Sequence, residues 1–136
     1  DRGMEKTMLP YCEQNNIAFL AYSPLAQGLL TGKVTPEREF DENDQRNRKD
    51  RFDPENRRKV LAMLDEFRPI AEAHDITLAQ LAIAWTAAQP GSTHVLCGAR
   101  SPEQVRENAV GGEVELGDQE LATINAAIAK FAKDIP

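Results

Sequence analysis

The sequence has little of what marks several large classes of protein. It contains two cysteines, Cys12 and Cys97, whose spacing fits no metal site, and this usage favours a reduced, cytoplasmic protein. No apolar run approaches the roughly 18 residues of a membrane span, and nothing at the amino end resembles a signal peptide. Positive charge is scarce as well, since 16 Lys and Arg are set against 22 Asp and Glu for a net charge of −6. That balance argues against a general binder of nucleic acid or anionic membranes.

The chain does have enough apolar residues for one moderate core, and at 136 residues it holds one domain at most. Two apolar runs, residues 17–22 and 93–99, lack polar alternation. This pattern is typical of strands that are buried on both faces, as in a parallel sheet covered by helices.

Small residues and cations follow both runs. Gly28, Gly32 and Lys33 come after the first, while Gly98 lies at the carboxyl end of the second and Arg100 follows it. Ligands of α/β folds bind at the carboxyl ends of the strands, where these residues would lie. Arg100 also precedes a capping-box pattern that predicts a helix with a free N-terminus, which is suited to an anion. An ordinary loop after each strand is the alternative, and spacing alone does not decide between them.

Helices are predicted over residues 4–15, 54–73, 77–88 and 101–112, and from residue 118 onward. Pro69 is expected to kink the second of these or to end it early. Residues 28–52 show no sustained periodicity, and their acidic residues come before a cluster of cations that includes Arg46, Arg48 and Lys49. We interpret this segment either as a solvated, mobile loop or as a flap that brings cations to an anionic ligand.

The predicted order is helix, strand, long loop, two helices, strand and two helices. Two parallel strands do not form a stable sheet on their own, and an α/β barrel needs eight strands and about 250 residues. The chain therefore has the organisation expected of the last part of such a barrel.

Three segments carry a resemblance to a known family. Residues 21–33 (AYSPLAQGLLTGK) resemble the seventh-strand segment of the aldo-keto reductase superfamily, residues 97–108 (CGARSPEQVREN) resemble its eighth-strand segment, and residues 79–85 are similar to the helix between them. The resemblance covers nearly the whole chain in order and spacing. It implies an α/β fold, namely the C-terminal part (strands 7 and 8 with their helices) of a (β/α)8 TIM barrel. Residues 1–136 would form a partial barrel, with residues 28–52 as a long cofactor-covering loop.

The same resemblance implies an oxidoreductase that uses NADPH to reduce aldehydes or ketones to alcohols. It places Ser23, Leu25, Gln27 and Gly28 at the pyrophosphate, Lys33 and Arg46 on the covering loop, and Arg100 at the ribose 2′-phosphate. Gln104 and Asn108 would contact the adenine end, and Tyr22 would lie near the nicotinamide. The full set of expected cofactor-binding residues is Tyr22, Ser23, Pro24, Leu25, Gln27, Gly28, Lys33, Arg46, Gly98, Arg100, Gln104 and Asn108.

No catalytic or metal-binding residue is expected in this chain. The family's catalytic Asp, Tyr, Lys and His come from earlier strands, so we predict that the chain alone is inactive. His74 and His94 are not expected to be catalytic, and Cys97 is expected to be packed and inert. The implied partners are NADP(H), a small carbonyl substrate in the complete protein, and either the missing amino-terminal half of the barrel or a second copy.

Two alternatives stay open from the sequence. One is a non-catalytic, nucleotide-sensing member of the family that resembles the potassium-channel beta subunits. The other is a short structural or oligomerisation module.

Overall fold

The computed structural model describes residues 2–131 and 133. Its sheet consists of two parallel strands, β1 (Leu20–Tyr22) and β2 (His94–Leu96), in which Ala21 lies opposite Val95. The carbonyl of Phe19 accepts hydrogen bonds from the N–H groups of Thr93 and His94, both at 3.1 Å. Two parallel strands were predicted, but the predicted lengths were wrong, because each strand has three residues. In the described residues each strand pairs only with the other, so the outer edge of each strand is not paired with a further strand.

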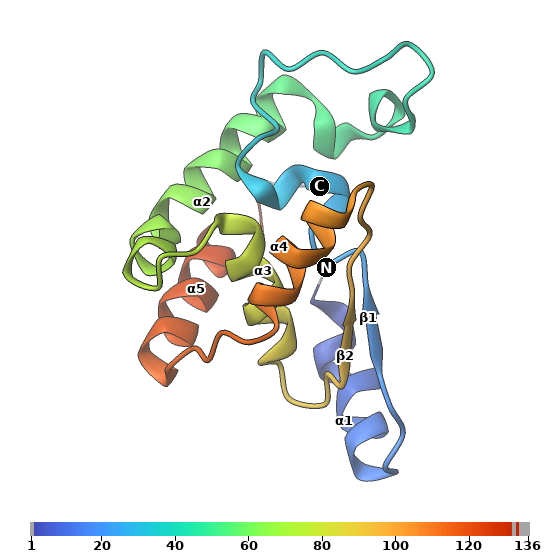
Figure 1. Cartoon of the computed structure of the whole chain (residues 1–136), viewed down its shortest axis with the longest axis vertical. Coiled ribbons are helices and arrows are strands. Elements are labelled where there is room, and N and C mark those ends of the chain that lie inside the picture. Colours follow the sequence, from blue (N-terminus) through green and yellow to red (C-terminus); the bar gives the residue numbers. More distant parts are fainter. Residues whose placement is uncertain (1, 132, 134–136) are drawn as a thin grey trace.

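Helices make up most of the molecule (Figure 1). A 3₁₀ turn, η1 (Gly3–Lys6), and α1 (Met8–Gln14) lead into the sheet, and α2 (Pro54–Ala73) and α3 (Leu78–Ala87) follow the long loop. After β2 come α4 (Pro102–Gly111) and α5 (Asp118–Phe131). The predicted helices are therefore present, although the first is divided at Thr7. Helix α2 packs on α5, while α3 packs on α4, α2 and β2.

Pro69 lies inside α2, which continues to Ala73, so the expected early end is wrong. Proline removes one backbone N–H, and the carbonyl that loses its donor belongs to Asp65, an exposed residue that water can reach. Burial on both sides of the proline holds the helix together, since Phe67 is 6% exposed and Ala71 is 2% exposed.

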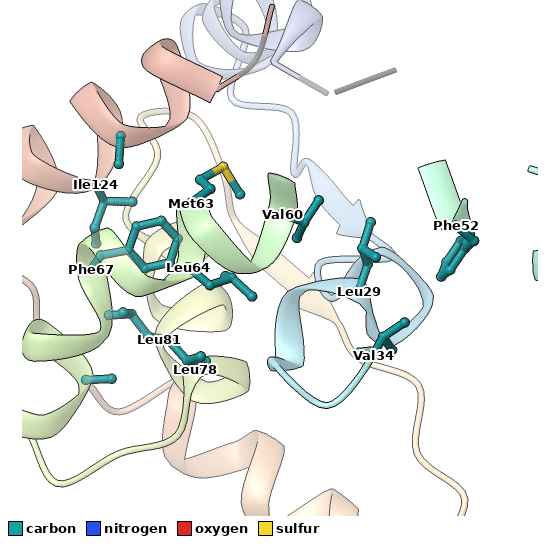
Figure 2. Packing of buried hydrophobic residues seen from close by; sticks show 12 residues of the cluster. Leu29, Val34, Phe52, Val60, Met63, Leu64, Phe67, Leu78, Leu81 and Ile124 are labelled. Carbon is teal, nitrogen blue, oxygen red and sulfur yellow. The ribbon is translucent and has the colours of Figure 1, made fainter. Parts of the chain in front are cut away.

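The hydrophobic core lies among the helices and not beneath the sheet (Figure 2). Helices α2, α3 and α5 contribute most of it, and the long loop adds three residues. Its members are Leu29, Val34, Phe52, Val60, Met63, Leu64, Phe67, Ala71, Leu78, Leu81, Ile124 and Ala127. By contrast, Leu20, Tyr22 and Leu96 in the strands are 49%, 81% and 48% exposed. The expected burial of both strand faces is therefore not met within this chain.

The long loop, residues 28–52, is more regular than its sequence predicted. Turn η2 (Ala26–Thr31) opens it, and turns η3 (Gln45–Arg48) and η4 (Asp50–Phe52) close it. Arg57 on α2, only 6% exposed, holds the middle, because its Nη1 donates to the carbonyls of Thr35 and Arg38 at 2.7 Å each. Core residues thus hold both ends of the loop, and a buried arginine holds the part between them.

A close helix contact fixes α4 against α3. A Cβ added to Gly111 would lie 2.9 Å from the carbonyl oxygen of Gln80, so the glycine lets α4 approach α3 closely. The Gln80 side chain then donates from Nε2 to the carbonyl of Glu107 at 2.9 Å. These contacts hold the middle and the carboxyl end of α4 against α3.

Candidate functional site

The turn that follows β1 has a strained backbone. Ser23, Ala26 and Gln27 have φ of 57°, 47° and 58°, and Gly28 follows with 93°. Positive φ is uncommon for residues other than glycine and costs about 1–3 kcal/mol each. Backbone hydrogen bonds from Ala26 to Ser23 and from Gly28 to Leu25, both 2.9 Å, keep the turn closed. Strain of this kind is concentrated at ligand sites, so this turn is the first part of the candidate site.

The turn is tied to the long loop by a side-chain contact. Lys49 Nζ donates to Gln27 Oε1 at 2.7 Å across 22 positions of sequence. At the other end of the turn, Thr31 Oγ1 donates to the carbonyl of Gly28 at 2.7 Å and accepts the N–H of Lys33 at 3.2 Å. Lys33 itself is exposed. Two cations, Lys33 and Lys49, therefore flank the strained turn.

Arg46 on the long loop forms a compact pair with Asp44. Its Nε and Nη2 donate to the two carboxylate oxygens at 2.9 and 2.6 Å, and its backbone N–H donates to Oδ1 at 2.9 Å. The guanidinium also lies over the ring of Phe40, 4.1 Å from its centroid. Phe40 in turn meets Phe52 edge-on, with ring centroids 5.8 Å apart. The pair is thus anchored through Phe40 to the core.

These contacts lower the pKa of the Asp44 carboxyl to about 2, first through the Arg46 side chain and then through the Arg46 N–H. The charge of Arg100 lowers the Asp44 pKa further. Hydrogen bonding to Asp44 raises the pKa of Arg46.

The loop after β2 forms the third part of the site. Arg100 is exposed, and its backbone N–H donates to Gln104 Oε1 at 2.8 Å. Ser101 caps α4 by accepting the N–H of Gln104 at 3.3 Å, as its sequence pattern predicted. Asn108 Nδ2 donates to the carbonyl of Gly98 at 3.3 Å. Gln104 and Asn108 thus fold back onto the loop and hold its backbone in shape.

The residues singled out from the sequence fall on these three segments. Because β1 and β2 are parallel and in register, the turns that follow them leave from the same end of the sheet. The long loop meets the first turn at Gln27, and the charge of Arg100 is one of the causes that lower the pKa of Asp44 on that loop. Tyr22 ends β1. On the turn after it lie Ser23, Pro24, Leu25, Gln27 and Gly28; Lys33 and Arg46 are on the long loop; and Gly98, Arg100, Gln104 and Asn108 follow β2.

His74, His94 and Cys97 were not expected to act. His74 ends α2 and contacts Glu120 Oε1 through Nε2 at 2.8 Å, and His94 is an exposed residue of β2. Burial raises the pKa of the Cys97 thiol, which disfavours the reactive thiolate. Within residues 2–131 and 133, no three His, Cys, Asp or Glu side chains are grouped so that they could hold a metal ion.

The sequence reasoning did not find the roles of Asp44, Phe40 and Arg57. Asp44 was one of several acidic residues in a charged segment, and its position two residues before Arg46 was the available signal. Arginine is rarely buried, so nothing in the sequence marked Arg57 as an anchor.

Comparison with known proteins identifies the family. The sequence profile of the Aldo/keto reductase family matches residues 2–129. The chain belongs to this family. An NADH-specific methylglyoxal reductase of Escherichia coli (strain K12) is 42% identical over 118 residues, which are 87% of this chain and 36% of that protein. A probable voltage-gated potassium channel subunit beta of Arabidopsis thaliana is 34% identical over 110 residues, 77% of this chain and 33% of that protein.

The fold comparison agrees with the sequence profile. The structure of a glycerol dehydrogenase from Gluconobacter oxydans superposes with a TM-score of 0.89 at 33% identity, covering 100% of this chain and 41% of that one. The chain thus spans about a third of the length of these two curated relatives. None of the helices in the described part of the chain is long and apolar enough to cross a membrane.

Proposed function

We propose that this chain forms the cofactor-binding, carboxy-terminal part of an NADP(H)-dependent aldo-keto reductase. In this proposal, β1 and β2 are strands seven and eight of a (β/α)8 barrel, and residues 28–52 cover the bound cofactor. A longer chain that carries this segment within a complete barrel is called the parent protein below.

One observation carries the proposal. Two turns leave the same end of a parallel sheet, one strained and flanked by Lys33 and Lys49 and the other presenting an exposed Arg100, and the long loop that bears Arg46 contacts the first turn through Lys49. Barrel enzymes commonly bind phosphate with the loops after strands seven and eight. A dinucleotide with a pyrophosphate at one turn and a further phosphate at the other fits this distribution of cations.

Within this proposal, each residue group has its own task. Ser23, Leu25, Gln27 and Gly28 hold the pyrophosphate, with Pro24 stiffening the turn and Lys33 and Arg46 above it. Arg100 meets the ribose 2′-phosphate, and Gln104 and Asn108 face the adenine end. Gly98 lies beside open space, since a Cβ added there would meet nothing within 4 Å. Gln104 still has its amide nitrogen for a ligand, because its Oε1 takes the loop N–H. Tyr22, 81% exposed, lies beside the nicotinamide.

When bound, the nicotinamide would supply a hydride to the carbonyl carbon of an aldehyde or ketone. The residues of this chain orient the cofactor and balance its charge. The family's catalytic Asp, Tyr, Lys and His belong to other strands, so the chain alone is proposed to reduce no carbonyl.

The choice of cofactor is tested by Arg100→Ala in the parent protein. We expect NADPH binding to weaken about ten- to a hundredfold and NADH binding to change little, because one charge-assisted pair with the 2′-phosphate is lost. Arg106→Ala is the matched control, since Arg106 is on α4, the helix that follows Arg100, with its side chain 75% exposed and paired with Glu103. Equal weakening of NADPH and NADH binding would show that Arg100 does not contact the 2′-phosphate.

The similarity to a probable potassium channel subunit beta supports a second candidate, a nucleotide-sensing protein that binds the cofactor without rapid turnover. Both candidates use the proposed cofactor-binding segments of this chain, and they differ in the rest of the barrel. Steady-state reduction of simple aldehydes by the parent protein separates them, because a sensor would bind NADPH and show little turnover.

A further inference from the structure

One hydrogen bond joins the long loop to the strained turn after β1. Lys49 Nζ donates to Gln27 Oε1 at 2.7 Å, and within residues 2–131 and 133 no other hydrogen bond links residues 23–32 to residues 34–52. Lys49 lies between η3 and η4 and is only partly exposed, although it carries a charge. The polar contact between loop and turn therefore depends on a single ammonium group.

The charge of Lys49 is not neutralised by a carboxylate. Among the described residues its side chain bonds only to the neutral amide oxygen of Gln27, and it forms no ion pair with them. Arg46 on the same loop is different, because its guanidinium donates to both carboxylate oxygens of Asp44. An ammonium has three N–H donors, so Lys49 has two left for a ligand. A partly buried cation in this state attracts an anion more strongly than a fully solvated one does.

The turn beside Lys49 has a further unused donor. The N–H of Gln27 makes no hydrogen bond within the described part of the chain, whereas that of Gly28 donates to the carbonyl of Leu25 at 2.9 Å. Gln27 and Gly28 have φ of 58° and 93°, and turns of this kind present backbone N–H groups to anions. The turn thus offers an unoccupied backbone donor next to a cation that has no counter-charge.

We propose that Lys49 is a further cofactor-binding residue, whose ammonium contacts the pyrophosphate at the turn and slows the release of the cofactor. The inference rests on the proposed function, because it takes the turn after β1 as the pyrophosphate site. A phosphate that holds Lys49 also holds the long loop against the turn, so the loop and the cofactor stabilise each other. NADPH and NADH share the pyrophosphate, so the effect of Lys49 is the same for both.

A merely structural role of Lys49 has a different signature. If Lys49 only braces the loop through Gln27, it contributes a hydrogen bond to a neutral group, which depends little on ionic strength. If it binds the pyrophosphate, it contributes an attraction between opposite charges, which salt weakens. The salt dependence of cofactor release therefore separates the two roles.

The experiment is a stopped-flow measurement of NADPH and NADH association and dissociation with the parent protein at two ionic strengths. Cofactor fluorescence is followed, and an excess of the oxidised cofactor starts dissociation. Lys49→Met keeps the long side chain and removes its charge. We expect both cofactors to dissociate about tenfold faster from it, with a smaller change in association and a weaker dependence on salt. Lys49→Arg keeps the charge and should restore most of the slow release.

Arg48→Met is the matched control, because Arg48 is the exposed neighbouring cation on the same loop. It should leave both rates unchanged, and an equal acceleration in this variant would overturn the inference. Unchanged release from Lys49→Met, faster release with the salt dependence of the wild type, or faster release of NADPH alone would each overturn the contact with the pyrophosphate. All three outcomes leave the proposed function intact. A parent protein that binds neither cofactor overturns the proposed function and this inference with it.

Discussion

Arg57 should determine how firmly the long loop is closed. Its Nη1 donates to the carbonyls of Thr35 and Arg38, and its guanidinium lies 5.5 Å from the centroid of Phe40. A hydrogen bond from a charged donor contributes about 1.5–3 kcal/mol. Thr35 and Arg38 are exposed, so water can replace part of the loss, and the lower figure applies to each bond. Arg57→Met should therefore lower the free energy of opening the loop by about 3 kcal/mol.

The effect on global stability should be smaller than the effect on the loop. Methionine keeps a long apolar stem in the same place, and it removes Arg57 Nε, which is buried without a partner. A buried unpaired donor costs about 1–3 kcal/mol, so its removal offsets part of the loss. The local change should exceed the change in the free energy of unfolding.

Amide hydrogen exchange measures both quantities. Peptides from residues 33–48 should exchange about a hundredfold faster in Arg57→Met, while peptides from α2 and α3 change much less. Arg58→Met is the matched control, because Arg58 is the exposed neighbour on the same helix. Loop exchange equal to that of Arg58→Met would refute the anchoring role, and a uniform increase over all helices would show that Arg57 supports the whole core instead.

Two further predictions concern acid and association. Hydrogen bonds lower the pKa values of the Asp44 and Glu120 carboxyls, so both ionised carboxylates stabilise the folded chain fully at neutral pH. This stabilisation is lost as the pH falls below about 4, with Asp44 protonating near pH 2. Amide exchange of the long loop, measured against falling pH, should show this loss of protection in the wild type, and Asp44→Asn should lack the contribution of Asp44. The exposed, unpaired strand edges should make the isolated 136-residue chain associate with itself or with the rest of a barrel. Sedimentation of the pure chain should show species larger than a monomer. A monomer with a sharp unfolding transition would contradict this prediction.

Local patterns in the sequence predicted the helices well because their causes lie within a few residues. The Thr77 hydroxyl accepts the N–H of Gln80 at 3.2 Å, and Gln80 Oε1 accepts the N–H of Thr77 at 2.8 Å, as the capping-box pattern requires. Helix α3 was expected to lie between other elements because it is apolar almost all round, and it packs against α2, α4, η2 and β2. The strand directions followed from the same kind of pattern.

Contacts between distant residues could not be predicted from one sequence. The Lys49–Gln27 and Arg57–Thr35 contacts each join residues 22 positions apart, and neither has a local signature. The predicted strand lengths were wrong for a related reason. An apolar run shows that a segment can be buried, but how far it pairs depends on neighbouring strands, and β1 and β2 have only each other.

The distribution of buried residues gives the two halves of the candidate site different supports. The long loop is built on the helical core, through Leu29, Val34 and Phe52, and α4, which follows the loop after β2, is held by the contact of Gly111 with Gln80. Neither anchor uses the exposed faces of the strands. Tyr22, in contrast, stands on a strand whose neighbours must come from outside this segment. In the proposed function, the chain itself sets the shape of the loops assigned to the phosphates, whereas the position of Tyr22, assigned to the nicotinamide, depends on the strands that would complete the sheet.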